Sequence, residues 1–300
     1  MFSNRIFIAI IFSIIITFSG NLTAQDSTKT NDNDNGWEWS WDKNEFEQWV
    51  HFGKKLPTIS LQYGFTDANR KDISAEFANP NLLEMQIGHT SRRLSHYADY
   101  LIKFTSRYFH IGYLSSQLAG SSDNPGELRT KSWRFGFGRS GGYGYKIGDA
   151  AVIPYSTYSF DWTRVDFENT SSLQSDNNII QRYDESFRFG SSSEGGISFI
   201  ASSLITIQAG YQRSIVFERH LFWKWAGSAL IEAAAQGLVD RFIKEIFRSS
   251  PAAGPVVYFL LKNALSYGIY ELRQEKMNWP FPSAPSLSFD SFKFGVTFTF

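Results

Sequence analysis

The stretch FKFGVTFTF, residues 292–300, alternates strictly between two kinds of side chain. One face carries Phe292, Phe294, Val296, Phe298 and Phe300, and the other carries Lys293, Gly295, Thr297 and Thr299. A period of two is typical of a β-strand with two unlike faces. In water, an aromatic face on an unpaired strand would promote aggregation. The pattern therefore requires something that covers both the side chains and the backbone edge.

Seven earlier stretches show the same alternation. Their apolar positions lie within residues 59–65, 83–87, 109–113, 133–137, 158–162, 187–199 and 205–217. The other faces hold Gly, Ser, Thr and charged residues, and Phe, Trp and Tyr recur toward the strand ends. Aromatic girdles outside and a crowded polar interior are the pattern of an all-β transmembrane protein, an antiparallel up-and-down barrel. The strand count is eight, with ten as the alternative. A soluble sandwich, whose apolar faces form the core, is the competing interpretation.

The composition excludes several other classes. The chain has 300 residues, of which 17% are aromatic, and its formal net charge is zero. Its mean hydropathy of −0.26 argues against a helical membrane protein, and its neutral charge gives no reason to expect a nucleic-acid partner. Because the chain lacks Cys, disulfides and Cys-based metal sites or nucleophiles are excluded.

The N-terminal region predicts export. A short basic start precedes the apolar run 6–18, and small residues follow up to Ala24, so residues 1–24 have the three-part pattern of a cleaved signal peptide. An uncleaved anchor is the alternative. Residues 25–56 are expected to form a polar linker followed by a Trp-rich amphipathic segment. This segment either lies at a membrane interface or packs on its own domain. Residues 57–300 form the predicted barrel.

Residues 221–275 break the period of two. Leu230, Leu238 and Ile246 belong to an apolar stripe that repeats every four residues, which predicts an amphipathic helix. A second, more apolar helix is expected at 256–273. The resulting hairpin, inserted before the last strand, either caps the mouth of the barrel, lies in the outer leaflet, or fills the lumen of a barrel with more strands.

The connections between strands alternate in length. Residues 67–81, 115–131 and 163–185 are long and polar, whereas 201–204 form a tight turn. The segment 89–107 is the exception, being long on the short-turn side, and the glycine-rich stretch 139–149 is interpreted as a turn. Barrels with long outer loops and short periplasmic turns keep both chain ends in the periplasm.

An alternating last strand that ends on Phe300 resembles the C-terminal signature of Gram-negative outer-membrane β-barrel proteins. The resemblance identifies a class, and the Phe, Asn and Ile content is similar to that of Bacteroidota proteins. It implies residence in the outer-membrane lipid and recognition by the barrel-assembly machinery. The residues that carry this assembly signal are Phe292, Phe294, Phe298 and Phe300.

Few residues suggest chemistry. The five His residues form no zinc-protease motif, and no hydrolase elbow or phosphate-binding loop is present. His89 and Ser91 share a strand face and resemble the His-x-Ser pair of outer-membrane lipid A deacylases. However, Arg92 and Arg93 follow where that family places Asn. We expect no metal, no cofactor and no catalysis, so the enzyme question rests on this pair alone.

The inward-facing parity defines a polar network in the lumen. Its members are Glu84, Gln86, His110, Arg134, Asp161, Arg188, Glu194, Gln208 and Lys293. Because a buried lone charge is very costly, opposite charges there should pair. The pairs either fill a closed barrel or line a polar path for a solute. The expected function is therefore a non-enzymatic outer-membrane barrel whose helical insert caps or stabilises it, or binds a lipid or protein partner. A small solute channel and a lipid A-modifying enzyme are the alternatives.

Overall fold

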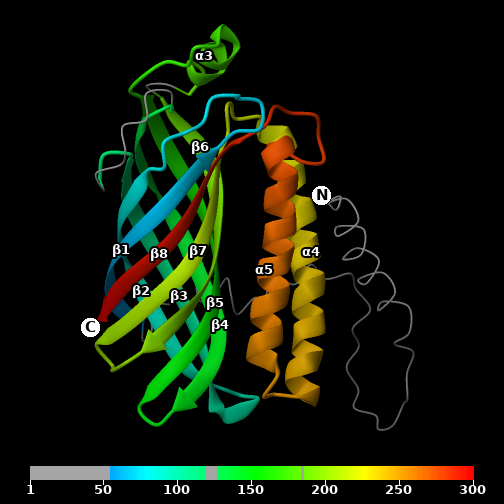
Figure 1. Cartoon of the computed structure of the whole chain (residues 1–300). Helices are drawn as coiled ribbons and strands as arrows, with labels where there is room; N and C mark the ends of the chain where they lie inside the picture. The colour runs from blue at the N-terminus through cyan, green and yellow to red at the C-terminus, as the bar shows by residue number, and fades with distance from the viewer. Residues whose placement is uncertain (1–54, 119–126, 184–185) are drawn as a thin grey trace. The chain divides into compact units, whose positions relative to one another are not determined.

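The computed structural model describes residues 55–118, 127–183 and 186–300. The predicted signal peptide lies outside these ranges, as does the predicted segment 25–56 except for its last two residues. Eight antiparallel strands pair in sequence order, and the first closes on the last (Figure 1). The strands are β1 (Leu56–Asn69), β2 (Asn81–Ser95), β3 (Ala98–Ser115), β4 (Thr130–Ile147), β5 (Ala150–Phe167), β6 (Phe187–Ile200), β7 (Ile205–Val216) and β8 (Leu287–Thr299). This confirms the predicted up-and-down barrel of eight strands, and the alternative count of ten is wrong.

Closure accounts for the backbone of the stretch 292–300. On one side β8 pairs with β1, so that Phe298 stands opposite Ile59 and Phe292 opposite Phe65. On the other side it pairs with β7, with Phe294 opposite Ala209. Both edges of the strand are therefore hydrogen-bonded, and only its aromatic face still needs a cover.

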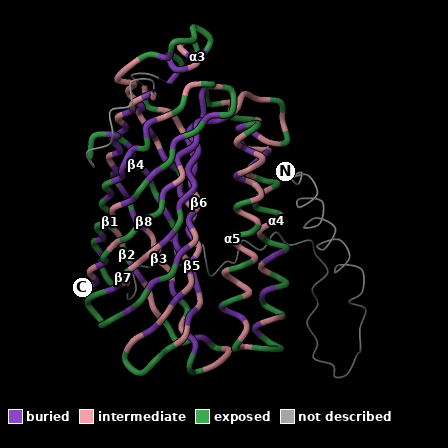
Figure 2. The backbone as a smooth tube through the Cα atoms, in the orientation of Figure 1, coloured by how far each residue is buried: buried purple, intermediate pink, exposed green. Residues whose placement is uncertain are grey.

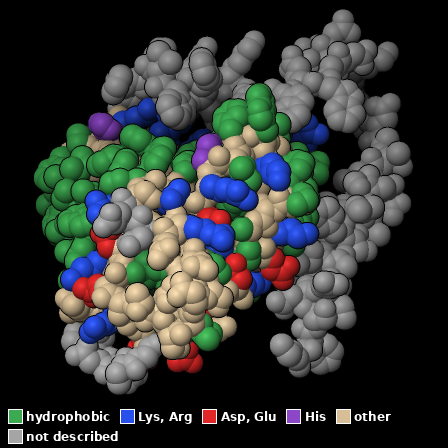
Figure 3. Space-filling view, turned by 90° about the horizontal axis from the view of Figure 1, so that it is seen from above, with side chains coloured by type: hydrophobic (Ala, Val, Ile, Leu, Met, Phe, Trp, Pro, Cys, Tyr) green, Lys and Arg blue, Asp and Glu red, His purple; other side chains and the backbone are tan. Residues whose placement is uncertain are grey.

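The two ends of the barrel differ, as the loop lengths predict. The turn end holds the connections 96–97, 148–149 and 201–204, and also the start of β1 and the end of β8. The loop end holds the connections 70–80, 116–129, 168–186 and 217–286. The third of these contains the short helix α3 (Gln174–Ile180), which the sequence interpretation missed. Seen from above in Figure 3, charged and other polar side chains gather at the loop end.

Two predicted connections are strands instead. Residues 89–107 are the ends of β2 and β3 around a two-residue turn, and the glycine-rich stretch continues β4 as far as Ile147. Its glycines are an adaptation to crowding: a Cβ on Gly142 or Gly144 would lie 2.3 or 2.2 Å from a carbonyl oxygen of β5. Of the glycines in this stretch, only Gly148 (φ 60°) lies in the turn, in a conformation that favours glycine.

The helical hairpin runs along the outside of the wall. Helices α4 (Phe222–Ser249) and α5 (Gly254–Glu275) confirm the predicted insert. They leave the barrel at the loop end, and α5 packs against β4, β5, β6 and β7 with α4 beside it (Figure 1). The tip reaches the turn end, where the Tyr145 hydroxyl donates to the carbonyl of Ala252 at 2.6 Å. The placements over the mouth and inside the lumen are therefore wrong. By length and hydropathy together, none of the helices in the described ranges qualifies as a membrane-spanning segment.

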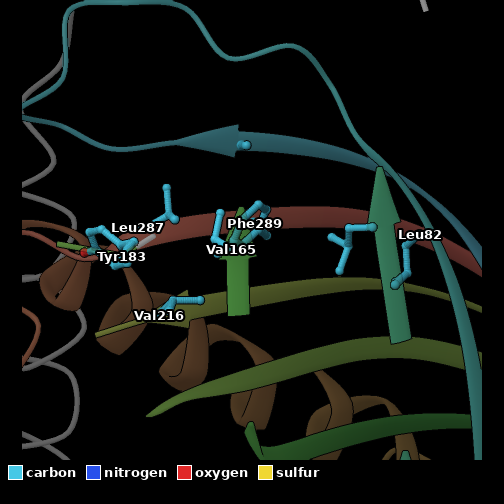
Figure 4. Packing of buried hydrophobic residues seen from close by; sticks show 8 residues of the cluster. Leu82, Val165, Tyr183, Val216, Leu287 and Phe289 are labelled. Carbon is cyan, nitrogen blue, oxygen red and sulfur yellow. The ribbon is translucent and has the colours of Figure 1, made fainter. Parts of the chain in front are cut away.

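Along β1, β2 and β4, inward positions are mostly buried and outward positions mostly exposed or half-buried, whereas the second half of β7 is buried on both faces (Figure 2). Near the loop end, inward apolar side chains form a layer that includes Leu82, Val216 and Phe289, with Tyr183 from the connection above (Figure 4). Near the turn end, Phe104, Ala151, Ile153 and Ile200 form an apolar cluster on the side of β3, β5 and β6. On the other side of the lumen at this end, polar residues such as Thr58, Arg92 and Thr206 line a cavity. Polar side chains also occupy the middle of the lumen.

Candidate functional site

Lys293 lies at the centre of an ion-pair network in the lumen. Its Nζ is 3.0 Å from Oε1 of Glu84 and 2.8 Å from Oε2 of Glu194. Arg134 pairs with the other oxygen of Glu84 and donates to Gln212 at 2.7 Å. These four charged side chains are 4% exposed or less. They come from β2, β4, β6 and β8, so the network ties opposite sides of the barrel together.

A second buried pair adjoins the first. The Nε2 of His110 is 3.0 Å from Oδ1 of Asp161, and Ser159 donates to the same oxygen at 3.0 Å. Ser159 also contacts Ser192 at 2.5 Å, and Gln212 donates to Ser192 at 3.4 Å. The pair of His110 and Asp161 and the ion pairs around Lys293 thus form one network. In this network, three carboxylates face two permanent cations and one imidazole.

Seven of the nine predicted lumen residues meet in this network, including Gln86, which donates to Glu84 at 2.9 Å. Gln208 lies nearer the turn end, where it accepts from Thr297 at 3.3 Å. Arg188 lies at the loop end and donates to the carbonyl of Arg182. Both are inward-facing, but the height of each residue in the barrel depends on register, which parity does not reveal.

The sequence interpretation missed inward-facing members of the network. The Tyr155 hydroxyl donates to Glu194 at 2.5 Å, and Gln212 links the two pairs. Extending the alternation of the fifth strand back to residue 155 would have found Tyr155, and Gln212 already lies at the inward parity within the predicted stretch 205–217. Within the described ranges, no three His, Asp or Glu side chains are grouped as metal ligands.

His89 and Ser91 lie on the outer face of β2, with His89 opposite Pro57 on one side and Arg107 on the other. The imidazole of His89 is exposed. Among the described residues, no ion pair joins it to a carboxylate, so the structure brings no acidic partner to this pair.

The hairpin covers a polar row on the outer wall. Tyr158, Ser193, Arg213 and Asp290 stand opposite one another across β5, β6, β7 and β8. The Tyr270 hydroxyl of α5 donates to the carboxylate of Asp290. These outward-facing polar groups would otherwise interrupt an apolar wall.

Aromatic and charged contacts hold the hairpin against this row. The ring of Tyr267 lies 5.0 Å from the guanidinium carbon of Arg213. Arg273 joins the two helices through Glu232 at 2.9 Å and Ser228 at 3.0 Å. Near the hairpin tip, Phe247 of α4 stacks on Tyr97, with ring centroids 4.8 Å apart. The hairpin is therefore attached along its length.

Three of the predicted assembly residues face outward on β8, and Phe300 follows directly after this strand. Phe292, Phe294 and Phe300 are 44%, 47% and 63% exposed, and Phe298 is half-buried. They continue an apolar surface that includes Leu61 and Phe65 of β1.

No protein-family model matches the chain, and no curated protein matches it. Among the solved structures that are similar over most of its length are the following two. Neisserial surface protein A matches with 9% identity and a TM-score of 0.36, covering 81% of this chain and 97% of its own. Ail, the attachment invasion locus protein of Yersinia pestis, matches with 7% identity and a TM-score of 0.31, covering 82% and 99%. The fold assignment rests on the strand pairing of the chain itself.

Proposed function

We propose that the protein is an integral outer-membrane β-barrel, exported by a cleaved signal peptide, that neither conducts solutes nor catalyses a reaction. The observation that carries the proposal is the outward apolar surface. Large apolar side chains that are more than one-third exposed occur on all eight strands, including Leu61, Met85, Phe109, Trp133, Phe160, Phe187, Ile207 and Phe294. Fully burying one such side chain is worth about 1.5–3 kcal/mol, so lipid is the solvent that this surface fits.

Closure of the barrel supports the same proposal. Lipid provides no hydrogen-bond partners, so a spanning structure must pair every backbone group internally. Here β1 pairs with β8, which leaves no open edge in the sheet.

The filled lumen favours a closed barrel over a solute channel. The network around Lys293 crosses the middle, and the apolar layer around Phe289 closes the lumen on its loop side. On its turn side, the apolar cluster around Ile153 lies next to a polar cavity. An eight-stranded barrel has an interior that side chains can fill. The network around Lys293 then stabilises the interior of a closed barrel and does not line a path for a solute.

We propose that the hairpin stabilises the barrel from within the lipid. Its inner side covers the polar row that includes Arg213 and Asp290. Its outer side exposes Leu230 and Leu238 of α4 and Leu260 of α5, which are each at least 55% exposed. Some polar groups of the helices face the wall or each other, as Tyr270 and the pair of Arg273 and Glu232 do, whereas Arg241 and Lys244 of α4 are exposed toward the hairpin tip.

The location is tested by fractionation and by heat-modifiable migration on a gel. We expect the protein in the outer-membrane fraction, migrating faster before boiling than after. Recovery as a soluble periplasmic protein would overturn the proposal. Planar bilayers test closure: the purified barrel should be electrically silent, and steady single-channel conductance would support the channel alternative instead.

Single cysteines introduced into this Cys-free chain test the hairpin. In intact membranes, Leu230→Cys and Leu260→Cys should resist a water-soluble maleimide and react after denaturation. Arg248→Cys, at the 67%-exposed side chain near the tip, is the matched control and should react when the reagent is in the periplasm. Equal labelling at all three positions would place the hairpin outside the lipid.

A further inference from the structure

A small polar pocket lies between the helical hairpin and the wall of the barrel. Ser193 and Arg213 line it from the wall, and Ser266 and Arg273 line it from α5. The pocket contains about 260 Å³ of empty space, part of which opens to the outside. We call it the hairpin pocket. Its hydrogen-bonding groups need partners close by, because the surrounding lipid chains provide none.

The two guanidinium groups of the hairpin pocket differ in their partners. The Nε atoms of Arg213 and Arg273 are both buried without a hydrogen-bond partner in the described ranges. Arg273 nevertheless pairs with Glu232 at 2.9 Å and donates to Ser228 at 3.0 Å. Arg213 is only 8% exposed, and no described residue gives it an ion pair or a hydrogen bond. It is therefore the group of this pocket that lacks a partner.

The neighbours of Arg213 stabilise its charge but leave its N–H groups unbonded. The rings of Tyr267 and Tyr211 lie 5.0 and 5.9 Å from its guanidinium carbon, and an aromatic face attracts a cation. Asp290 stands opposite it on β8 and attracts its charge from beyond ion-pair distance, while Tyr270 donates to that carboxylate. Because unsatisfied buried donors are costly, an oxygen placed in the pocket would be strongly favoured.

The position of Arg213 on β7 connects the hairpin pocket with the lipid. This strand runs from the turn end at Ile205 to the loop end at Val216, so Arg213 lies near the loop end. Toward the middle of the barrel wall, the next outward position but one is Ala209, and Ile207 follows with 50% exposure. An amphiphile whose polar end meets Arg213 would thus find an apolar path for its chain.

We propose that the hairpin pocket binds the carboxylate of a fatty acid in the outer half of the membrane. A guanidinium group matches a carboxylate because it donates two parallel hydrogen bonds to it. The hydroxyl of Ser193, which stands opposite Arg213 on β6, provides a further donor. The acyl chain lies along β7 over Ala209 and Ile207. This inference rests on the proposed membrane location of the barrel.

The shape and charge of the hairpin pocket favour a carboxylate over a phosphate. A carboxylate ends its chain and needs one exit from the pocket, whereas a phosphodiester carries a substituent on each side and needs two. A phosphate monoester carries nearly two negative charges, but Glu232 already pairs with Arg273. One unbonded guanidinium group therefore suits one singly charged group.

Native mass spectrometry of the full chain tests the proposal. The detergent-purified barrel is offered palmitic acid or 1-hexadecanol, which has the same chain length and no charge. The wild type should retain the acid at least about tenfold better than the alcohol. Arg213→Gln should remove most of this preference. Arg241→Gln removes the same charge from an exposed position of α4 and should leave the preference unchanged.

A second variant and two competition arms complete the design. Ser193→Leu keeps every charge and places an apolar side chain in the pocket, so it should also remove the preference and decides the question if Arg213→Gln folds poorly. Equal retention of acid and alcohol by the wild type, or a folded variant of either kind that keeps the preference, would overturn the proposal. Displacement of palmitic acid by millimolar acetate would overturn the role of the acyl chain, and stronger retention of hexadecyl phosphate would overturn the choice of a carboxylate. Because fractionation and heat-modifiable migration are independent of fatty-acid retention, failure here would leave the proposed function intact.

Discussion

Replacing Lys293 by Met should destabilise the barrel more than any surface substitution. The side chain is 2% exposed and its Nζ contacts two carboxylates, Glu84 and Glu194. Met preserves most of the volume and removes the charge. The substitution therefore isolates the electrostatic role of the lysine and leaves two buried carboxylates with one cation fewer.

Removing one partner of a buried ion pair typically costs about 3–5 kcal/mol. The lower end applies here, because Glu84 keeps Arg134 and Glu194 keeps the hydroxyl of Tyr155. For a folded unit of this size, a loss of about 3 kcal/mol corresponds to a fall of roughly 6–12 °C in melting temperature.

The melting temperature can be read from heat-modifiable migration of the folded barrel in detergent. Lys131→Met at the loop end is the matched control, because the Lys131 side chain is 39% exposed, and it should change the melting temperature little. Adding Glu194→Gln to Lys293→Met removes one carboxylate charge and should recover at least about 1 kcal/mol, because neighbouring substitutions couple. A fall of less than about 2 °C for Lys293→Met, or strictly additive effects in the double variant, would refute an ion-pair network that stabilises the lumen.

Three further predictions test other parts of the molecule. Deleting Phe300 should lower the yield of folded barrel in cells more than the melting temperature of inserted barrel, measured by immunoblot and heat-modifiable migration; equal yields would contradict the assembly role. Gly136→Ala should destabilise the barrel by about 1–3 kcal/mol, because its Cβ would lie 2.1 Å from a backbone oxygen of β5. Gly268→Ala, with open space around it, should instead stabilise α5 by about 0.5–1 kcal/mol. If urea unfolding showed stability changes of the same sign for both variants, the packing argument would be refuted. Burial raises the pKa of Glu218, but hydrogen bonds from Arg70 and Arg182 outweigh it and hold that pKa below its usual value. The stability that Glu218 contributes is therefore present above its unfolded-state pKa and is lost as the pH falls through its folded-state pKa. Below about pH 4, the melting temperature of the wild type should fall more steeply than that of Glu218→Gln, and parallel curves would argue against this contribution.

Local alternation was enough to identify the strands, since a side chain's face in a strand follows from its parity alone. For this reason the eight strands, the inward position of Lys293 and the outward position of Phe294 were predictable. The hairpin was predictable on the same grounds, because a change of period from two to nearly four marks a helix. Glycine misled the interpretation of residues 139–149, because it is common both in turns and in crowded barrel interiors.

The sequence by itself determined the class of fold, the two faces of each strand and the existence of the hairpin, because these depend on periodicities within one segment. Only the tertiary structure decided which inward residues meet, since strand register sets their height: it joins Lys293 to Glu84 and Glu194 and leaves Arg188 at the loop end. It likewise decided that the hairpin lies along the outer wall, over the row containing Arg213 and Asp290. That row exists only when four strands are aligned side by side, so no single stretch of sequence contains it.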